Sequence, residues 1–161
     1  MALNAYLSLN AEKQGLVRGS VTQKGREGKI LVFACMHEIV CPRDPTSGRP
    51  TGKRMHKPIV ITKELDRSSP LLFSILCNNE NIPHWELQFW TPNSTGVEKQ
   101  HFTIRLTNAN ISAIHSKMSN TKSPKLSRFP EYEEVSFTYQ KIEWTWTDGN
   151  LSACDDWETP R

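Results

Sequence analysis

Three potential zinc ligands stand close together in the first third of the chain. Cysteine and histidine are preferred zinc ligands, and Cys35, His37 and Cys41 fall within one short apolar segment. In an extended strand they would share a face, yet Cys35 and Cys41 would lie about 20 Å apart at ~3.3 Å per residue. One zinc ion would need both sulfurs at about 2.3 Å. The spacing favours free thiols and an edge-facing histidine, and we predict no metal and no cofactor.

Catalytic signatures are also missing from the sequence. The five histidines are scattered, and no GxSxG, HExxH or closely spaced carboxylate pair accompanies them. No glycine-rich phosphate cradle precedes a helix. A catalytic site assembled from distant segments remains open as an alternative, but the prediction is that this chain is not an enzyme.

The most unusual stretch is the basic segment at residues 42–57. Its prolines and glycines exclude a regular helix and disfavour a central strand. A loop of this length in a compact domain is usually functional or disordered, and the default alternative is a solvated charged loop. We interpret it as an interaction arm whose candidate contact residues are Arg43, Asp44, Arg49, Lys53, Arg54, His56 and Lys57.

Acidic residues elsewhere in the chain offer a partner for this arm. The basic segment contains no aromatic residue for base stacking, and a net charge of +3 is too small to indicate a nucleic-acid partner. A positive arm and a negative patch on one chain suit head-to-tail self-association. The candidate acidic patch consists of Glu131, Glu133, Glu134, Asp155, Asp156 and Glu158.

Length and composition are those of one soluble domain. A chain of 161 residues is long enough to bury a core without disulfides, and the four cysteines are expected to be reduced thiols of a protein folded in the cytosol. No apolar run is long enough for a membrane span. The N-terminus lacks the charged and apolar regions of a signal peptide.

The first half of the chain predicts short strands and one helix. Residues 5–9, 15–21 and 59–62 are expected as strands. The apolar run at residues 30–40 predicts a strand buried on both faces for part of its length. A short helix is expected at residues 70–77, with Ser69 as its N-cap and Pro70 at its first position. Asn78 and Asn79 are suited to end it in a left-handed conformation.

The second half shows the period-two alternation of half-buried strands. Trp85, Leu87 and Phe89 alternate with polar neighbours, and so do residues 102–107, 135–139 and 142–146. The phase slips near residues 109–110 and 140–141, which predicts β-bulges. Many short strands with one helix indicate a mainly β protein: a closed or nearly closed β-barrel of two antiparallel sheets with one short α-helix and a long extended loop.

Four segments in this order resemble the Hcp family, the haemolysin-coregulated tube proteins of bacterial type VI secretion systems. They are REGKILVFACMHEI at residues 26–39, GKRMHKPIVITKELDRSSPLL at residues 52–72, EEVSFTYQKIEWTW at residues 133–146, and DDW at residues 155–157. The resemblance implies one Hcp-like β-barrel domain over residues 1–161. It also implies a six-membered ring that stacks head-to-tail into a tube inside a contractile sheath.

The same resemblance implies the remaining partners and the location. The tube is capped by a spike protein and propelled into neighbouring cells, and its lumen binds and chaperones secreted effectors. The subunit would assemble in the bacterial cytoplasm and leave it without a signal peptide, with no membrane insertion. The family is not catalytic unless it is fused to a toxic domain.

Carried onto this chain, the family's extended loop corresponds to residues 42–57 and is expected to join stacked rings. Lumen-facing positions are expected on the strand at residues 30–40, where Met36 and Glu38 share one phase, with the helix near the inner rim. The competing hypothesis is a soluble β-barrel adaptor, monomeric or ring-only, that binds one protein partner through the basic loop and never polymerises.

Overall fold

The computed structural model describes residues 1–158 and contains mainly antiparallel strands. The elements in chain order are β1 (Ala5–Ala11), β2 (Gly15–Val17), β3 (Ile30–Val32), β4 (Ala34–Met36), β5 (Ile39–Val40), β6 (Met55–His56), β7 (Ile59–Glu64), α1 (Ser69–Cys77), β8 (Ile82–Pro92), β9 (Glu98–Lys117), β10 (Tyr132–Thr138), β11 (Lys141–Trp146), a 3-10 turn (Thr147–Gly149) and β12 (Leu151–Asp156).

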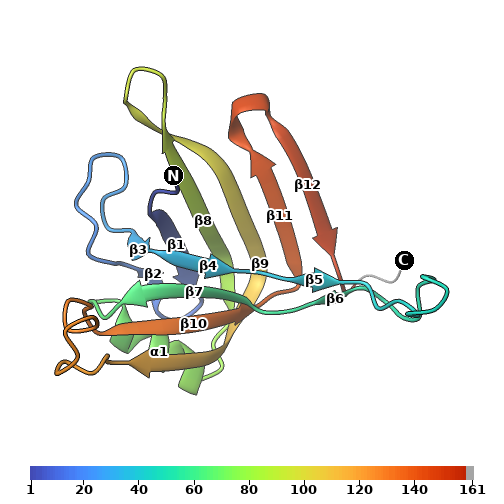
Figure 1. Ribbon diagram of the computed structural model, residues 1–161, viewed down its shortest axis with the longest axis horizontal. Helices are drawn as coiled ribbons and strands as arrows, with labels where there is room; N and C mark the ends of the chain where they lie inside the picture. Colours follow the sequence, from blue (N-terminus) through green and yellow to red (C-terminus); the bar gives the residue numbers. More distant parts are fainter. Residues whose placement is uncertain (159–161) are drawn as a thin grey trace.

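Two sheets share the long strand β9. In sheet A the order is β12-β11-β9-β8-β1, with β2 and β3 both pairing with β1. In sheet B the order is β9-β10-β7-β4. The first half of β9 belongs to sheet A and its second half to sheet B, so β9 turns the corner between the two sheets (Figure 1). The predicted class of two antiparallel sheets with one helix is confirmed.

The segment at residues 30–40 makes the second connection between the sheets, and here the prediction of one buried strand is wrong. β3 pairs with β1 in sheet A, whereas β4 pairs with β7 in sheet B. The ladder is interrupted at Phe33, so the barrel is not closed by continuous pairing. Ile30 and Val32 are buried, but all of β4 is exposed because it is the edge strand of its sheet.

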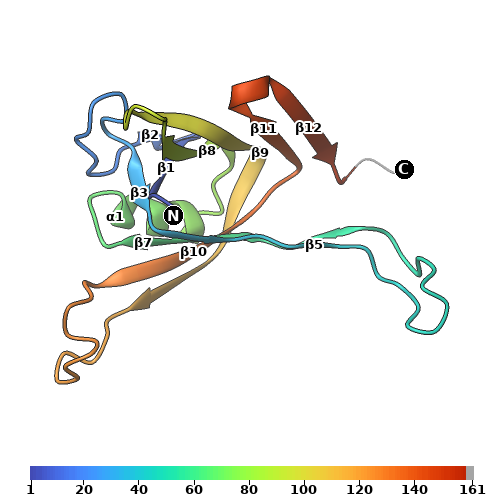
Figure 2. The same ribbon diagram turned by 45° about the horizontal axis from the view of Figure 1, so that its top comes forward.

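The core lies between the sheets and is covered at one end by α1. Leu7, Leu87, Ile61 and Phe137 are completely buried there. α1 adds Leu72 and Ile75 and sits between the two sheets in Figure 2. The alternation of apolar and polar residues therefore produces the expected two antiparallel sheets around one core.

The start of α1 differs by one residue from the prediction. Ser68 is the N-cap and Ser69 is the first helical residue. The Ser69 hydroxyl lies 3.0 Å from the Lys63 ammonium and donates to Glu133 Oε1 at 2.8 Å. Because this contact ties the helix to sheet B, Ser69 is not available as a cap. At the other end, Asn79 has a left-handed φ of +47°, as the sequence predicted.

The two predicted phase slips lie where the chain passes between sheets. Asn108 has a left-handed φ of +51°, next to the predicted bulge at residues 109–110. The buried apolar positions of β9 are even-numbered up to Leu106 and odd-numbered from Ala109 onward. Between β10 and β11, residues 139 and 140 carry the chain from sheet B to sheet A. The first irregularity bends β9 between the sheets. The bulge predicted at residues 140–141 is wrong, because the chain there connects two separate strands, β10 and β11.

Candidate functional site: the arm and its root

The basic segment forms a projecting hairpin, which we call the arm (residues 39–56). Its base is a short ladder in which Ile39 pairs with His56 and Val40 with Met55. Beyond this ladder the loop at residues 41–54 extends away from both sheets, at the right of Figures 1 and 2. The arm is therefore an ordered extension of the strands that leave sheet B.

Local hydrogen bonds organise the arm tip (residues 43–53). Asp44 Oδ1 accepts from the backbone N–H groups of Thr46 and Ser47 at 2.9 and 2.6 Å. These bonds lower the pKa of the Asp44 carboxyl, so it stays ionised. Gly48 has φ +69° and closes the turn, a conformation that glycine adopts without strain. Asp44 thus shapes the tip and is not one of its free charges.

Three basic side chains are exposed on the tip: Arg43, Arg49 and Lys53. Arg43 donates to the carbonyl of Gly48 at 3.1 Å. The side chains of Arg49 and Lys53 form no ion pair or hydrogen bond with any of residues 1–158. The tip therefore presents positive charge to solvent.

The arm root, by contrast, is tied to the C-terminal segment of the same chain. Arg54 binds the Asp155 carboxylate as a fork, with N–O distances of 2.5 and 3.0 Å. The same guanidinium donates to the carbonyl of Asp156 at 3.1 Å. Bidentate pairing of this kind fixes direction as well as distance. Arg54 and Asp155, predicted to meet between rings, are thus partners within one subunit.

Two histidines meet at the root on one tyrosine hydroxyl. The Tyr139 oxygen lies 2.7 Å from His56 Nδ1 and 2.8 Å from His37 Nε2. The other nitrogen of His56 lies 2.8 Å from Asp155 Oδ2. We call this set the arm root: His37, Arg54, His56, Tyr139, Asp155 and Trp157.

For the form in which both imidazoles are neutral, the hydrogen-bond chain assigns their protons. Because the Asp155 carboxylate only accepts, His56 Nε2 carries the hydrogen and Nδ1 accepts from Tyr139. His37 Nε2 must then donate to the tyrosine oxygen. Burial, followed by the Asp155 charge, raises the pKa of Tyr139, so its hydroxyl stays protonated. Burial lowers the pKa of His37, and a positive charge on the neighbouring His56, when that imidazole is protonated, lowers it further.

Trp157 covers the root from the C-terminal side. Its ring stacks on His56 with centroids 5.7 Å apart and planes 18° from parallel, and its Nε1 donates to the carbonyl of Tyr139 at 2.5 Å. Carboxylate, imidazole and hydroxyl are aligned as in a nucleophilic triad. Tyr139 is only 5% exposed, however, and its hydroxyl contacts two histidines at the base of the arm. The arrangement suits a clasp that orients the arm.

The structure separates the acidic residues that were grouped from sequence. Glu133 is fully buried and lies 2.5 Å from Lys63, so it is not part of any surface patch. Glu134 is on the outer face of sheet B and pairs with Lys117 at 3.1 Å. Glu131 precedes β10, whereas Asp156 and the exposed Glu158 lie beyond the opposite end of that strand.

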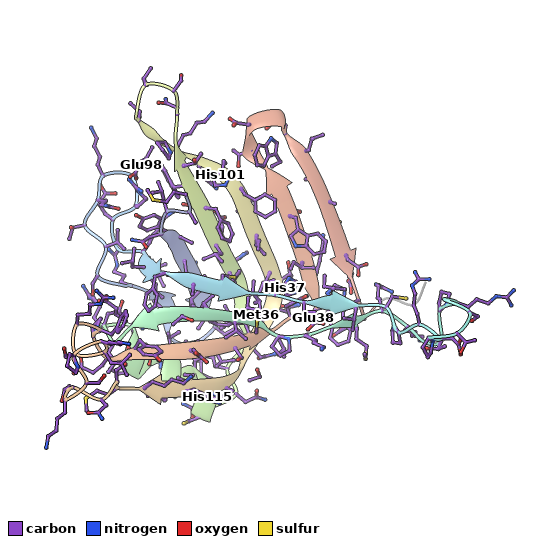
Figure 3. All side chains as sticks on the ribbon, viewed as in Figure 1. Met36, His37, Glu38, Glu98, His101 and His115 are labelled. Atoms are coloured by element: carbon purple, nitrogen blue, oxygen red, sulfur yellow. The ribbon has the colours of Figure 1, made fainter. Side chains whose placement is uncertain are left out.

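The candidate lumen residues lie where the outer face of sheet B meets the arm, as Figure 3 shows. Met36 is 69% exposed and shares a cross-strand row with Val60, Ser136 and Ala113. Glu38 lies past the end of β4 and pairs with Lys57 at 3.1 Å. Met36 is therefore on the sheet face, and Glu38 belongs to the base of the arm.

Sequence reasoning did not find His37, Tyr139 and Trp157 as members of the root. Tyr139 fits the period-two pattern as an ordinary core residue. The sequence does contain one signal for this site, which is the aromatic Trp157 directly after the acidic pair at residues 155 and 156. None of the described residues forms a helix with the length and apolarity of a membrane span.

Comparisons with known proteins point to one family. The family described as "Type VI secretion system effector, Hcp" matches residues 6–146. The "Major exported protein" of Pseudomonas aeruginosa is 39% identical, over 99% of this chain and 98% of that protein. A crystal structure of an Hcp protein superposes with a TM-score of 0.90 at 29% identity, covering 98% and 99% of the two chains. The secreted protein Hcp3 from Pseudomonas aeruginosa has a TM-score of 0.80 at 32% identity, covering 97% and 99%.

Proposed function

Because the chain belongs to the Hcp family of type VI secretion proteins, we propose that it is a structural subunit of the inner tube. Six copies form a ring, rings stack head-to-tail, and the lumen carries or chaperones effectors. A sheath surrounds the tube and a spike protein caps it. The subunit assembles in the cytoplasm and is exported with the tube. The name of the Pseudomonas relative, "Major exported protein", supports the export.

The observation that carries this proposal is the pair of free edges on sheet B. β4 pairs only with β7, so its outer edge has no partner among residues 1–158. The second half of β9, after Ala109, pairs only with β10. Free strand edges are templates for pairing with another chain. A four-stranded sheet with two different free edges suits copies arranged edge to edge around an axis.

The outer face of sheet B has the character expected of a lumen lining. Two adjacent cross-strand rows lie on this face, and most of their side chains are small or uncharged. The only charge in these rows, Glu134, is compensated by Lys117 of the next row. Such a face offers few strong sites and would let varied effectors pass. The rows are Ala34, Thr62, Glu134 and His115, and Met36, Val60, Ser136 and Ala113.

The arm supplies the stacking contact in this proposal. Its root fixes the direction, and its exposed tip charges at Arg43, Arg49 and Lys53 meet the neighbouring ring. Lys57 and Glu38 neutralise each other at the base, and Arg54, His56 and Asp155 are occupied within the subunit. Glu134 is likewise paired, with Lys117, so the remaining candidates for an acidic contact are Glu131, Asp156 and Glu158.

Native mass spectrometry combined with electron microscopy tests the proposal. Rings of six at micromolar concentration, and tubes on concentration, are the expected result. A protein that stays monomeric would overturn it and favour the adaptor that binds one partner through its basic arm. Rings that form but never stack would support the proposed ring and contradict the stacking role of the arm.

A further inference from the structure

Sheet A carries an apolar surface that residues 1–158 leave uncovered. Cross-strand pairing places Phe89, Phe102, Trp146 and Leu151 in one row. The next row runs from the buried Leu87 and Ile104 to Trp144 and Ala153. Exposure increases along both rows toward β12, reaching 43% at Trp146 and 69% at Leu151. We call the outer part of these rows the apolar shelf: Phe89, Phe102, Trp144, Trp146, Leu151 and Ala153.

The opposite face of the same strands has the composition of a solvent-exposed face. Arg105 pairs there with Glu86 at 3.0 Å and with Glu143 at 3.4 Å, and Cys154 continues that row. β11 and β12 are thus amphipathic, with the apolar side turned toward the interior of the barrel. Large exposed apolar patches mark interaction sites in soluble proteins. The apolar shelf is therefore a candidate interaction surface.

α1 has an exposed stripe that matches the shelf in character. The helix contains no charged residue between Ser69 and Cys77, although a surface helix normally carries charge on its solvent side. Pro70, Phe73 and Cys77 are exposed and spaced three and four residues apart, so they form one stripe. Phe73 is 38% exposed.

The shelf and the helix stripe lie beside different free edges of sheet B. Phe89 of the shelf lines an open cavity of about 240 Å³ together with Ala34 and Cys35 of the β4 edge. α1 packs on β9, the strand that forms the other edge. One lateral side of the subunit thus combines the β4 edge with the shelf, and the other combines the β9 edge with α1.

We propose that α1 of a second copy docks on the apolar shelf, with Phe73 against Trp146 and Leu151. The inference rests on the proposed ring and names its lateral contact. The contact joins two different surfaces, so it is heterologous and propagates from copy to copy until the ring closes. The Ser69 hydroxyl donates to Glu133, which is also paired with the buried Lys63, and these contacts fix the start of α1 on sheet B.

Complementary single substitutions test the docking. Phe73→Glu spoils only the helix stripe and Leu151→Glu only the shelf, and both sites are exposed, so the monomer should fold. In native mass spectrometry each variant should need a concentration higher by roughly tenfold or more to assemble. An equimolar mixture still has one intact helix and one intact shelf, so it should give heterodimers and no rings.

Each outcome of the mixing experiment bears on a distinct claim. If the wild type forms rings and both variants do so equally well, the docking is wrong while the tube proposal stands. If each variant alone forms a dimer, a self-complementary contact replaces the heterologous one. If the wild type itself stays monomeric, the proposed function fails first. Circular dichroism and thermal unfolding of both variants show whether a loss of assembly reflects unfolding.

Oxidative cross-linking supplies an independent readout from the native thiol of Cys77. In a background with Cys35, Cys41 and Cys154 changed to serine, Ala153→Cys should give a ladder of linked copies in denaturing gels. The matched control restores Cys154 and keeps Ala153, because that thiol lies one residue away on the opposite face of β12. Equal ladders from both would overturn the assigned face, as would a ladder that persists after Cys77→Ser.

Discussion

The root and the tip of the arm contain the same kinds of residue but use them differently. At the root, Arg54 is held by Asp155 and the carbonyl of Asp156. At the tip, Arg49 and Lys53 have no such partner among residues 1–158. The difference shows that a cluster of positive charge in a sequence can combine an internal clasp with a free surface. It also divides the predicted stacking residues into those that are bound within the subunit and those that are exposed at the tip.

The largest effect should come from removing the tip. Deleting residues 46–53 leaves the root and both sheets intact, so rings should form while tubes are lost. Electron microscopy of the concentrated protein distinguishes the two states. A variant with residues 46–53 replaced by alternating glycine and serine is the matched control, because it keeps the length of the arm and removes its side chains. Normal tubes from the deletion would refute the stacking role of the arm.

The next largest effect should come from opening the root at its centre. Tyr139→Phe leaves His37 Nε2 and His56 Nδ1 without their shared partner in a largely buried site. An unsatisfied buried polar group costs about 1–3 kcal/mol, and the free energy of unfolding in urea should fall by about that amount. Hydrogen exchange in β5 and β6 should become faster.

Tyr132→Phe is the control for this experiment. The Tyr132 ring contacts Phe33 at 6.4 Å between centroids, and its hydroxyl forms no hydrogen bond with any of residues 1–158. Its loss should change stability by less than about 0.5 kcal/mol. Equal effects from the two tyrosines would mean that the root hydroxyl is not specially important.

Local patterns explain how far the fold could be predicted. The alternation around Trp85 and Leu87 predicted β8 because one face of an antiparallel sheet is buried. Asn79 ended the helix as expected because asparagine tolerates a left-handed backbone. The prediction for residues 30–40 was wrong because an apolar run fits one long buried strand as well as it fits short strands in different sheets. Nothing local shows that the chain changes sheets at Phe33 and leaves β4 on an edge.

The root could not be predicted for a different reason. His56 and Asp155 are 99 residues apart in sequence, and His37 and Tyr139 are 102 apart. Their contact depends on β10, β11 and β12 returning to the base of the arm. Glu133 lies in the buried phase of β10 with Val135 and Phe137, and its charge is accommodated there by Lys63, a partner 70 residues away in the sequence. Charge counting identified the arm but could not tell which charges were already neutralised.

Charge reversal at the tip should have a smaller, salt-dependent effect. Arg49→Glu combined with Lys53→Glu should weaken stacking by roughly threefold to tenfold at low ionic strength. The difference should vanish near 1 M salt, where the screening length is about 3 Å. Unfolding in urea should be unchanged within about 0.5 kcal/mol. A salt-independent loss, measured by sedimentation of tubes, would point to shape or backbone contacts instead of charge.

The smallest effect should be the pH dependence of the root. The pKa of His37 is lowered in the folded protein, chiefly by burial and then by the nearby His56. The unfolded chain therefore binds the proton more readily, and stability that is complete above the ordinary pKa of about 6.5 is lost as the pH falls below it. His37→Gln keeps a side-chain N–H for Tyr139 but cannot titrate. Urea unfolding of both proteins at about pH 7.5 and about pH 5 should show the smaller pH difference in the variant. Identical pH profiles would mean that protonation of His37 does not act on the clasp, and the root would then orient the arm through Arg54, Asp155 and Trp157 alone.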